Sequence, residues 1–318
     1  MTKSPYYPMP GKDYPQTWTQ FVDWFYDDTT CATFLERLRW PDGFVCPRCH
    51  EKTKPLRTTR GRFTCLECRY ESTVTTGTIF HSTKTPLRTW FATVWYVTNQ
   101  KQGTNALGLQ RVMGFKSYQT AWTHLHKLRR AMVRPDRDQL NGRVEIDESY
   151  LGGHEAGVRG RQTEKKAIVA IAVEIKEQRG LGRIRLRRVS DVSGASLIPF
   201  VQDMVQSGAT VHTDGWNAYS ALASLGYHHE VTIQSSKGDP AHVSMPGVHR
   251  VASLLKRWIL GTHHGSFGMK QLDYYLDEFT FRFNRRKSKS RGLLFYRLLE
   301  QSVITAPVSY NSLVQDGS

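Results

Sequence analysis

The sequence predicts a mixed α/β protein in which an α/β domain follows a cysteine-rich module and a helical region. Residues 143 to about 300 alternate strand-like and helix-like segments, as an α/β domain does. Residues 46–82 hold four of the five cysteines, and residues 86–135 show helical periodicity. We therefore expect five segments: an N-terminal helical segment (1–45), the cysteine-rich module (46–85), the helical region (86–140), the α/β domain (141–302) and a loosely held tail (303–318).

The charge of the chain predicts a polyanionic partner. Among 318 residues, 44 are Lys or Arg and 28 are acidic, which gives a formal net charge of +16. Residues 101–135 carry seven basic residues and no acid, and residues 249–300 carry eleven against four. Because a cation near a phosphate releases condensed counterions, this clustering favours nucleic acid over an anionic membrane surface.

The sequence predicts a cytoplasmic protein that does not enter a membrane. Its first residues are polar and rich in proline, without an apolar leader. The apolar run 167–175 is far shorter than the roughly 20 residues that span a bilayer. Five cysteines, an odd number, argue against a disulfide framework.

Two pairs of cysteines predict a zinc ribbon in the cysteine-rich module. Each pair is a CxxC motif, and fifteen residues separate the second cysteine from the third. Each CxxC turn directs two thiolates at one ion, and two such turns complete a tetrahedron around zinc. The ligands are then Cys46, Cys49, Cys65 and Cys68. The alternatives are four unrelated buried thiols or a redox pair, and the fifth cysteine, Cys31, is expected in a core.

Helices are expected on both sides of the ribbon. Residues 18–43 predict two short helices that stop at Pro41 and Gly43. Beyond the ribbon, residues 107–115 and 117–132 predict two helices joined by a tight break, the second capped by Ser117. This arrangement is similar to a helix-turn-helix, whose second helix enters a major groove.

The second of these two helices is basic. Its apolar residues Trp122, Leu125 and Leu128 are expected to face inward. The basic residues in and before it that are expected to stay available to phosphates are Lys116, Lys127, Arg129 and Arg130. The alternative is a helical linker bundle whose charges are simply solvated.

The α/β domain places two aspartates at predicted strand ends. Three strands, a helix, a fourth strand, a helix, a fifth strand and a long helix are predicted, in that order, at 143–153, 165–175, 183–189, 194–205, 210–213, after 214, 228–233 and 248–260. Asp147 lies at the end of the first strand, before a turn, and Asp214 at the end of the fourth. Trp216 and Tyr219 follow and are expected in the core.

This order of elements resembles the ribonuclease H-like fold of DDE transposases and retroviral integrases. In that fold the first and fourth strands are adjacent at the centre of the sheet. Asp147 and Asp214 would therefore meet although 66 residues intervene. A third ligand normally comes from a later helix, and His249 follows Asp214 with 34 residues between them.

The aspartates suit metal-dependent chemistry on DNA. Cleavage of a phosphodiester by water and strand transfer by a 3′-hydroxyl both need an activated oxygen nucleophile and a stabilised leaving oxygen. Two divalent cations, Mg²⁺ or Mn²⁺, do both and prefer carboxylate oxygens. Taken singly, Asp147 could cap a turn and Asp214 a helix that begins near Trp216. Their order and their positions together favour catalysis.

The chain resembles the bacterial insertion-sequence transposases that join a zinc ribbon to a DDE-type domain. The resemblance covers roughly residues 35 to 300 and rests on WPDGFVCPRC, CLECRYESTVTTGTIFHSTKTPL, SYQTAWTHLHKLRRAM, VEIDESYLGG, VHTDGWNAY, SLLKRWILGTHHG and YLDEFTFRFNRR. It implies that the first two catalytic aspartates are Asp147 and Asp214. It also implies that Lys256, seven positions beyond the third catalytic position, belongs to the site.

The third catalytic position departs from the acidic pattern, because His249 stands where many DDE enzymes have Glu. An imidazole binds divalent ions but leaves the site one negative charge poorer than a carboxylate does. His249 could instead position the attacking water, act as a general base or be a surface histidine. Rival third carboxylates are Glu148, Asp277 and Glu278, although Glu148 would point to the opposite face of a continuing strand. Lys256 either anchors a DNA phosphate or is a solvated lysine.

The resemblance implies a transposase that binds the terminal inverted repeats of its own element and cuts and joins them with Mg²⁺ or Mn²⁺. Double-stranded DNA, as repeat and as target, would be its partner, and two ends cut in concert imply a homodimer or larger assembly. Further DNA contacts are expected at Arg250, Arg257, Arg285 and Arg286. The competing hypotheses are a zinc-ribbon regulator that does not cut DNA and a nuclease that does not transfer strands.

Overall fold

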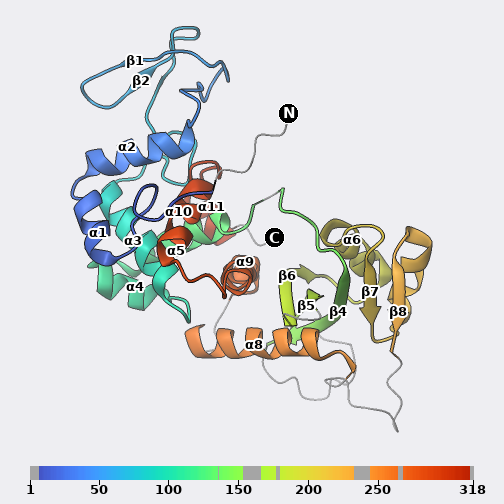
Figure 1. The fold of residues 1–318 in the computed structure, drawn as a ribbon. Helices are drawn as coiled ribbons and strands as arrows, with labels where there is room; N and C mark the ends of the chain where they lie inside the picture. Colours follow the sequence, from blue (N-terminus) through green and yellow to red (C-terminus); the bar gives the residue numbers. More distant parts are fainter. Residues whose placement is uncertain are drawn as a thin grey trace. The chain divides into compact units, whose positions relative to one another are not determined.

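The computed structural model describes residues 7–134, 136–152, 166–176, 180–232, 244–263 and 268–315. They form two compact units (Figure 1). The first unit comprises the chain up to residue 134 together with 287–315, and the second comprises 135–286. Within these described ranges, no helix combines the length and hydropathy that crossing a bilayer requires.

The first unit is helical apart from a small three-stranded sheet. Its helices are α1 (Trp18–Trp24), α2 (Asp28–Arg39), α3 (Leu87–Asn99), α4 (Ala106–Met113), α5 (Tyr118–Ala131), α10 (Arg291–Ser302) and α11 (Tyr310–Gln315). Its antiparallel strands are, in sheet order, β1 (Leu56–Arg57), β2 (Phe63–Thr64) and β3 (Glu71–Ser72). Helices α1 and α2 end before Pro41, as the sequence predicts, and Thr17 and Asp27 cap their N-termini.

An aromatic core joins α10 to helices from the beginning of the chain. Phe295 of α10 is fully buried, and its ring centroid lies 5.7 Å from that of Phe25 and 5.8 Å from that of Phe91. Gly292 allows a close approach, since a Cβ there would lie 1.8 Å from the carbonyl oxygen of Pro15. This packing explains why residues 287–315 belong to the first unit, whereas the sequence groups 141–302 in one domain.

The C-terminal segment is held more firmly than the loose tail that the sequence predicts. Leu313 of α11 is fully buried, and the ring of Tyr310 lies 5.8 Å from that of Trp122 in α5. Trp122 is itself only partly buried. The buried residues of α5 are Ala121, Leu125, Leu128 and Ala131 with three polar residues, His124, His126 and Arg129.

The predicted break between the last two helices before residue 135 is confirmed. Gly114 ends α4 with a φ of 67°, a left-handed conformation that glycine adopts without strain. The hydroxyl of Ser117 then accepts a hydrogen bond of 3.2 Å from the backbone N–H of Thr120 at the start of α5. Two helices joined by the four residues 114–117 are therefore present.

The second unit is built on a five-stranded sheet with the order β6-β5-β4-β7-β8. Its strands are β4 (Arg143–Leu151), β5 (Ala167–Lys176), β6 (Gly180–Val189), β7 (Thr210–Thr213) and β8 (His228–Val231). Strands β4, β5 and β6 form an antiparallel meander, β7 is parallel to β4, and β8 is parallel to β7. The first and fourth strands of this unit are therefore neighbours at the sheet centre, as the sequence predicts.

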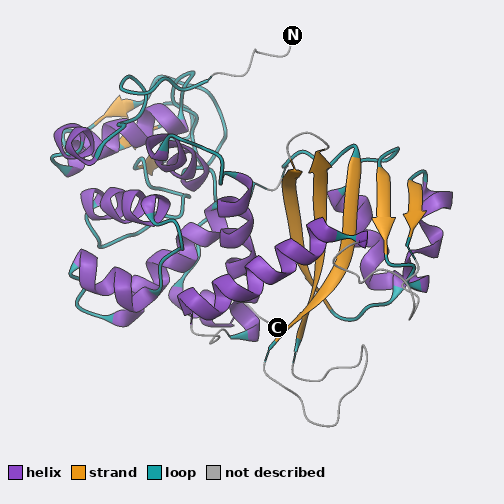
Figure 2. Cartoon of the chain, turned by 60° about the horizontal axis from the view of Figure 1, so that its bottom comes forward, coloured by secondary structure: helices purple, strands orange, loops and turns teal. Residues whose placement is uncertain are grey.

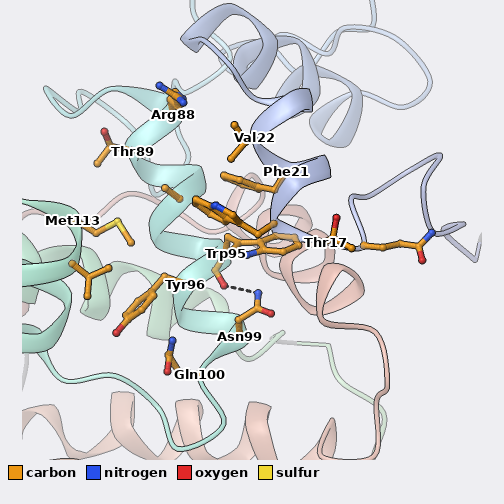
Figure 3. A pocket seen from close by; sticks show the side chains of 14 residues that line it. Thr17, Phe21, Val22, Arg88, Thr89, Trp95, Tyr96, Asn99, Gln100 and Met113 are labelled. Carbon is orange, nitrogen blue, oxygen red and sulfur yellow. Dashed lines mark hydrogen bonds between the residues drawn. The ribbon is translucent and has the colours of Figure 1, made fainter.

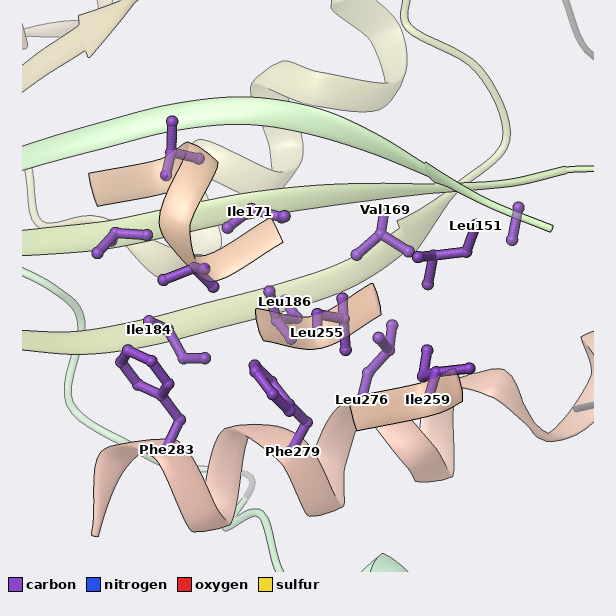
Figure 4. Close-up of a cluster of buried hydrophobic side chains, with 14 of the residues drawn as sticks. Leu151, Val169, Ile171, Ile184, Leu186, Leu255, Ile259, Leu276, Phe279 and Phe283 are labelled. Carbon is purple, nitrogen blue, oxygen red and sulfur yellow. The ribbon is translucent and has the colours of Figure 1, made fainter. Parts of the chain in front are cut away.

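Helices cover both faces of this sheet (Figure 2). They are α6 (Gly194–Met204), the 3₁₀ helix η1 (Asn217–Leu225), α8 (Pro246–His263), the 3₁₀ turn η2 (Met269–Gln271) and α9 (Leu272–Asn284). Figure 4 shows Val169 and Ile171 of β5 packed with Leu255 of α8 and Phe279 of α9 on one face. Because β5 is covered on both faces, it is apolar at nearly every position, as a central strand should be.

Candidate functional site

The four cysteines of the ribbon form a site that fits zinc. Their Sγ atoms all lie within 4.8 Å of one another, and the described residues contain no other group of three or more ligand atoms so close together. The Sγ atoms of Cys46 and Cys68 are 3.6 Å apart, and those of Cys49 and Cys65 are 3.7 Å apart. A tetrahedron with Zn–S bonds of about 2.3 Å has edges of about 3.8 Å, so the thiol cluster has the size that structural zinc requires.

Two matching turns hold these thiols. Each CxxC is followed by a residue with a left-handed backbone, His50 with φ 62° and Arg69 with φ 57°. In each turn that residue donates a backbone hydrogen bond to the first cysteine, over 3.0 Å to Cys46 and 3.1 Å to Cys65. Although burial opposes it, backbone hydrogen bonds lower the pKa of the Cys46 thiol, whereas hydrogen bonds with the neighbouring thiols raise the pKa of Cys49, so the first proton leaves the cluster at Cys46.

Cys31 takes no part in this site. It is fully buried in α2, and burial raises the pKa of its thiol to about 12. The sequence-based expectation of a core cysteine is confirmed.

The second site begins with the pairing of β4 and β7. The last paired residues are Glu145 of β4 and His212 of β7. Asp214 directly follows the last residue of β7, and the same register continued by two residues would place it level with Asp147, although it does not line the cavity beside Asp147 that is described below. Asp147 is the fifth residue of a nine-residue strand rather than its last, because β4 continues along β5 as far as Leu151. The predicted turn after Asp147 is therefore wrong, although the predicted meeting of the two strands is confirmed.

Helix α8 lies over the same face and brings a histidine to Asp147. The Nδ1 atom of His249 is 3.8 Å from Oδ2 of Asp147, and their side chains are 30% and 19% exposed. Lys256, two turns further along α8, is exposed and lines a cavity of about 350 Å³ together with both residues. The structure thus brings three of the four predicted catalytic residues to one cavity.

A buried glutamate holds the start of α8 against β4. Glu145 is 4% exposed, and its Oε2 accepts a hydrogen bond of 2.8 Å from the backbone N–H of Val248. Gly247 makes room for it, since a Cβ there would lie 2.8 Å from the same oxygen. Burial raises the pKa of Glu145, although these backbone hydrogen bonds oppose the rise. Glu145 therefore fixes the helix turn that carries His249.

The sequence analysis did not predict that Glu145 belongs to this site. Strand periodicity contains the signal, because residues two apart share a face and Glu145 precedes Asp147 by two. A carboxylate in an otherwise apolar strand is expected to have a structural or chemical partner when it is buried.

Glu148 points to the other face of the sheet, as predicted. The hydroxyl of Tyr219 donates a hydrogen bond to Oε1 of Glu148. Tyr219 is fully buried, and burial, followed by the charges of Glu148, Asp147 and Asp214, raises its pKa well above the usual value. The hydroxyl of Tyr219 therefore stays protonated and holds the Glu148 carboxylate by a hydrogen bond on the face of the sheet opposite α8.

The other rival carboxylates do not lie beside Asp147. Glu278 of α9 is fully buried and forms an ion pair of 2.7 Å with Arg282, one helical turn away. The charged groups around Asp277 are Arg137 and Asp273. Of the third ligands that the sequence offers, His249 and Glu148 line the cavity with Asp147, and His249 is the one whose side chain is described within 4 Å of the Asp147 carboxylate.

Asp214 has a structural role in this geometry. Its Oδ1 accepts a hydrogen bond of 3.0 Å from the backbone N–H of Trp216, at the start of η1. The expected α-helix after Asp214 is a 3₁₀ helix. Trp216 is 38% exposed, so its predicted place in the core is wrong, whereas Tyr219 does lie in the core.

The residues beside Asp147 suit a divalent ion in chemistry and in spacing. Carboxylate and imidazole are both ligands of Mn²⁺, and Mg²⁺ takes carboxylate oxygens. The 3.8 Å between His249 Nδ1 and Asp147 Oδ2 exceeds hydrogen-bond length but is shorter than two metal–ligand bonds of about 2.1 Å laid end to end. The donor set therefore fits an ion shared by Asp147 and His249.

One of the predicted DNA contacts is contradicted by burial. Arg129 is 2% exposed and lies with its Nη1 3.2 Å from Nε2 of His126, so it cannot reach a phosphate in this structure. His126 is also buried, and the Nη2 of Arg129 lies 3.5 Å from the carbonyl oxygen of Thr104. The inward face of α5 includes Arg129 because it follows Leu125 by four residues.

The side chains of the other predicted DNA-contacting residues differ in exposure. Exposed side chains are Lys116, Arg250, Arg257 and Arg286, and half-buried ones are Lys127, Arg130 and Arg285. Arg286 is already bonded to the carbonyl oxygens of Gly182 and Leu181. Arg285 lies over the ring of Phe281 at 4.1 Å. Arg250 and Arg257 lie on α8, the helix whose His249 and Lys256 line the cavity beside Asp147.

A cavity in the first unit has a different character. It has a volume of about 790 Å³ and is lined from α1, α3 and α4. Figure 3 shows Trp95, Phe21 and Tyr96 around it, with the amide of Asn99 bonded to the carbonyl oxygen of Trp95. Its lining includes no carboxylate, cysteine or histidine, so it offers no ligands for a metal.

Comparison with known proteins gives the same class of protein for both units. A family model for the ISXO2-like transposase domain matches residues 139–284, and one for the transposase zinc-ribbon domain matches residues 26–71. Together the two matches cover more than half of the chain. The chain belongs to the zinc-ribbon insertion-sequence transposases.

A relative comes from Halobacterium salinarum and is described as an uncharacterized protein in transposable element ISH50. It is 27% identical over 281 residues, which is 81% of this chain and 91% of the relative. The zinc-ribbon match also includes α2, which the sequence assigns to a separate segment. Contacts explain this extension, because Glu36 of α2 forms an ion pair with Arg57 of the hairpin and Trp40 packs on Phe63.

Proposed function

We propose that this protein is a DDE-type DNA transposase that cuts the terminal inverted repeats of its element and joins them to target DNA. The observation that carries the proposal is the pairing of β4, which bears Asp147, with β7, which ends just before Asp214, together with His249 facing Asp147. The order of the five strands supports a ribonuclease H-like fold for the second unit.

In this proposal Asp147, Asp214 and His249 hold Mg²⁺ or Mn²⁺. Bound metal would activate water or a 3′-hydroxyl and stabilise the leaving oxygen. His249 faces Asp147, and Asp214 follows the end of β7, the strand that pairs with β4. Lys256 is exposed at the same cavity and binds the phosphate beside the scissile bond, where a point charge is well suited. Glu145 and Tyr219 position the helix and the strand that carry these groups.

DNA recognition belongs to the first unit in this proposal. The zinc ribbon and the α4–α5 pair would recognise the repeat. Because Arg129 is buried, the exposed beginning of α5 is the surface that would enter a groove. It presents Lys116, Tyr118 and Gln119, all exposed. The working form would be a homodimer or larger assembly, since two ends are cut in concert.

The test uses the purified chain, a labelled duplex that contains one end of the element, and Mg²⁺ or Mn²⁺. Asp147→Asn and Asp214→Asn keep the side-chain shape and remove a negative charge at the site. Both are expected to lower end cleavage by at least about a hundredfold while a gel shift shows unchanged DNA binding. The matched control is Asp203→Asn, an exposed aspartate of the same unit whose surface ion pair with Arg187 contributes little.

The products separate the competing functions. Joined product from the wild-type chain supports the transposase. Cleavage without joined product would support a nuclease, and binding without cleavage would support a regulator. Wild-type cleavage by Asp147→Asn and Asp214→Asn would remove both aspartates from the mechanism.

A further inference from the structure

A second cavity lies beside Asp214, where β7 ends. It has a volume of about 660 Å³ and is lined from the beginning of α6 and from η1. In a sheet with parallel central strands, ligands bind at the carboxyl ends of those strands. Both Asp214 and this cavity lie at that end of β7. We call it the Trp216 groove.

Trp216 is held in a fixed relation to the aspartate. Its indole Nε1 donates a hydrogen bond of 2.7 Å to the carbonyl oxygen of Val192, and its backbone N–H donates one of 3.0 Å to Oδ1 of Asp214. The side chain is nevertheless 38% exposed and lines the groove. The ring of Trp216 is thus held at the surface, two residues after Asp214, a proposed metal ligand.

Small side chains keep the groove open. Ala195 of α6 and Ala218 and Ala221 of η1 line it, and Gly194 brings the two elements close, since a Cβ there would lie 3.3 Å from the carbonyl oxygen of Ala218. No charged side chain is among the residues that line it. The polar lining groups are the hydroxyls and amide of Ser193, Ser220 and Asn217. This lining suits a flat, uncharged ring with hydrogen-bonding edges better than an ion.

We propose that the Trp216 groove binds a nucleobase that leaves the stack at the cleaved end of the DNA. The proposal rests on the proposed function, because it needs a DNA phosphate at Asp147 and Asp214. Because the backbone N–H of Trp216 donates to Asp214, a phosphate held at Asp214 would have its neighbouring bases near the groove. Enzymes that act on DNA accept the cost of extruding a base and recover it by stacking on aromatic side chains. The groove would therefore fix the position of the scissile phosphate and favour binding of DNA whose terminal base pairs are open.

The test places 5-iodouracil at each position within three nucleotides of the cleavage site in the element-end duplex. Irradiation crosslinks a halogenated base to an aromatic ring that stacks on it, and mass spectrometry locates the crosslinked residue. One position is expected to crosslink to Trp216. Trp18, an exposed tryptophan of the first unit, provides the control, because Trp18→Ala should leave that crosslink unchanged.

Two variants test whether the groove matters for cleavage. Trp216→Ala removes the stacking surface and should slow cleavage by about ten- to a hundredfold without weakening binding of the duplex, whereas Trp216→Phe should restore most of the rate. Ala221→Phe fills the groove from an exposed position, so it should block the crosslink without disturbing the core. Trp216→Ala enlarges the groove and Ala221→Phe fills it, so the two variants test the same groove by opposite changes in volume.

The outcomes separate this proposal from the proposed function. Cleavage that ignores Asp147→Asn would overturn the proposed function. Cleavage that needs Asp147 but proceeds at the wild-type rate in Trp216→Ala and Ala221→Phe, with no crosslink to Trp216, would overturn the groove alone. Loss of self-association in Trp216→Ala, measured by sedimentation, with the crosslink absent from the wild type, would give the groove to a second copy of the chain instead.

Discussion

The zinc site of the first unit and the carboxylate site of the second are assembled in opposite ways. The zinc ligands lie within 23 consecutive residues, Cys46 to Cys68, and two matching turns hold them through their own backbone. The ligands that we propose for the carboxylate site, Asp147, Asp214 and His249, come from a central strand, the end of a neighbouring strand and a later helix. The first site is therefore local, and the second depends on the packing of a whole unit.

This difference predicts different consequences of losing a group. A local site supplies the folding energy of a module that has almost no core of its own. A site assembled from separate elements adds little to stability, because the sheet and its two apolar layers form without it. The variants below test this contrast, from the largest expected effect to the smallest.

Removing zinc should unfold the ribbon and leave the sheet of the second unit intact. Structural zinc contributes about 10–16 kcal/mol to zinc-finger peptides, and β1, β2 and β3 have only two residues each. We expect chelation, or Cys65→Ser, to abolish amide protection in residues 44–72 while β5 stays protected. Hydrogen exchange with mass spectrometry measures both regions, and metal analysis measures zinc per chain.

The fifth cysteine is the control for this prediction. Cys31→Ser should keep one zinc per chain, because Cys31 has no place in the cluster. Amide protection of the ribbon that survives complete loss of zinc would show that the module does not depend on its metal.

Replacing Glu145 should impair the carboxylate site through helix α8. Glu145→Ala leaves the buried N–H of Val248 without its acceptor, which costs about 1–3 kcal/mol, and frees the turn that carries His249. We expect cleavage of the element end to fall about tenfold or more, with DNA binding unchanged. Cleavage rates at saturating DNA, together with urea unfolding, give both effects.

Rescue distinguishes positioning from charge. Glu145→Gln keeps an oxygen that can accept from Val248 and should retain most of the cleavage rate. If the glutamine variant is as slow as the alanine variant, Glu145 acts through its charge, and the positioning role is wrong.

How far the sequence predicts the two sites follows from the same contrast. The spacing of the cysteines was enough for the zinc site, because backbone turns close over a few residues. Asp147 and Asp214 were predicted from strand order, since adjacent strands bring distant residues together. The middle position of Asp147 was not, because the antiparallel partner that carries β4 onward to Leu151 cannot be read from β4 alone.

Side-chain burial was predicted less well than topology. Arg129 is predicted as a phosphate contact in a basic helix, but its partners are His126 on the same face of α5 and Thr104 in the segment between α3 and α4. Trp216 is predicted in the core from its i, i+3 spacing to Tyr219, but it precedes η1 with an extended backbone (ψ 130°), so it does not share the helix face of Tyr219. Periodicity contains neither the partners of a side chain nor the residue at which a helix begins.

Asp277 should have the smallest effect, on stability alone and only through pH. Burial raises its pKa from 3.8 to about 7, the charge of Asp273 adds to the rise, and Arg137 opposes it. The folded chain therefore keeps a proton that the unfolded chain loses above pH 4, so this carboxyl makes the fold less stable as the pH rises from about 4 to about 7. Asp277→Asn resembles the protonated form at every pH and removes that loss.

We expect Asp277→Asn to be more stable than the wild type at pH 8, and by about half as much at pH 5.5, because the loss accumulates steadily between pH 4 and pH 7. Urea unfolding, followed by a signal from the second unit at both pH values, measures the difference. The variant should cleave DNA at the wild-type rate, in contrast to Asp147→Asn, because the charged groups around Asp277 are Arg137 and Asp273. A large loss of cleavage in Asp277→Asn would instead return this aspartate to the carboxylate site and remove His249 from the third position.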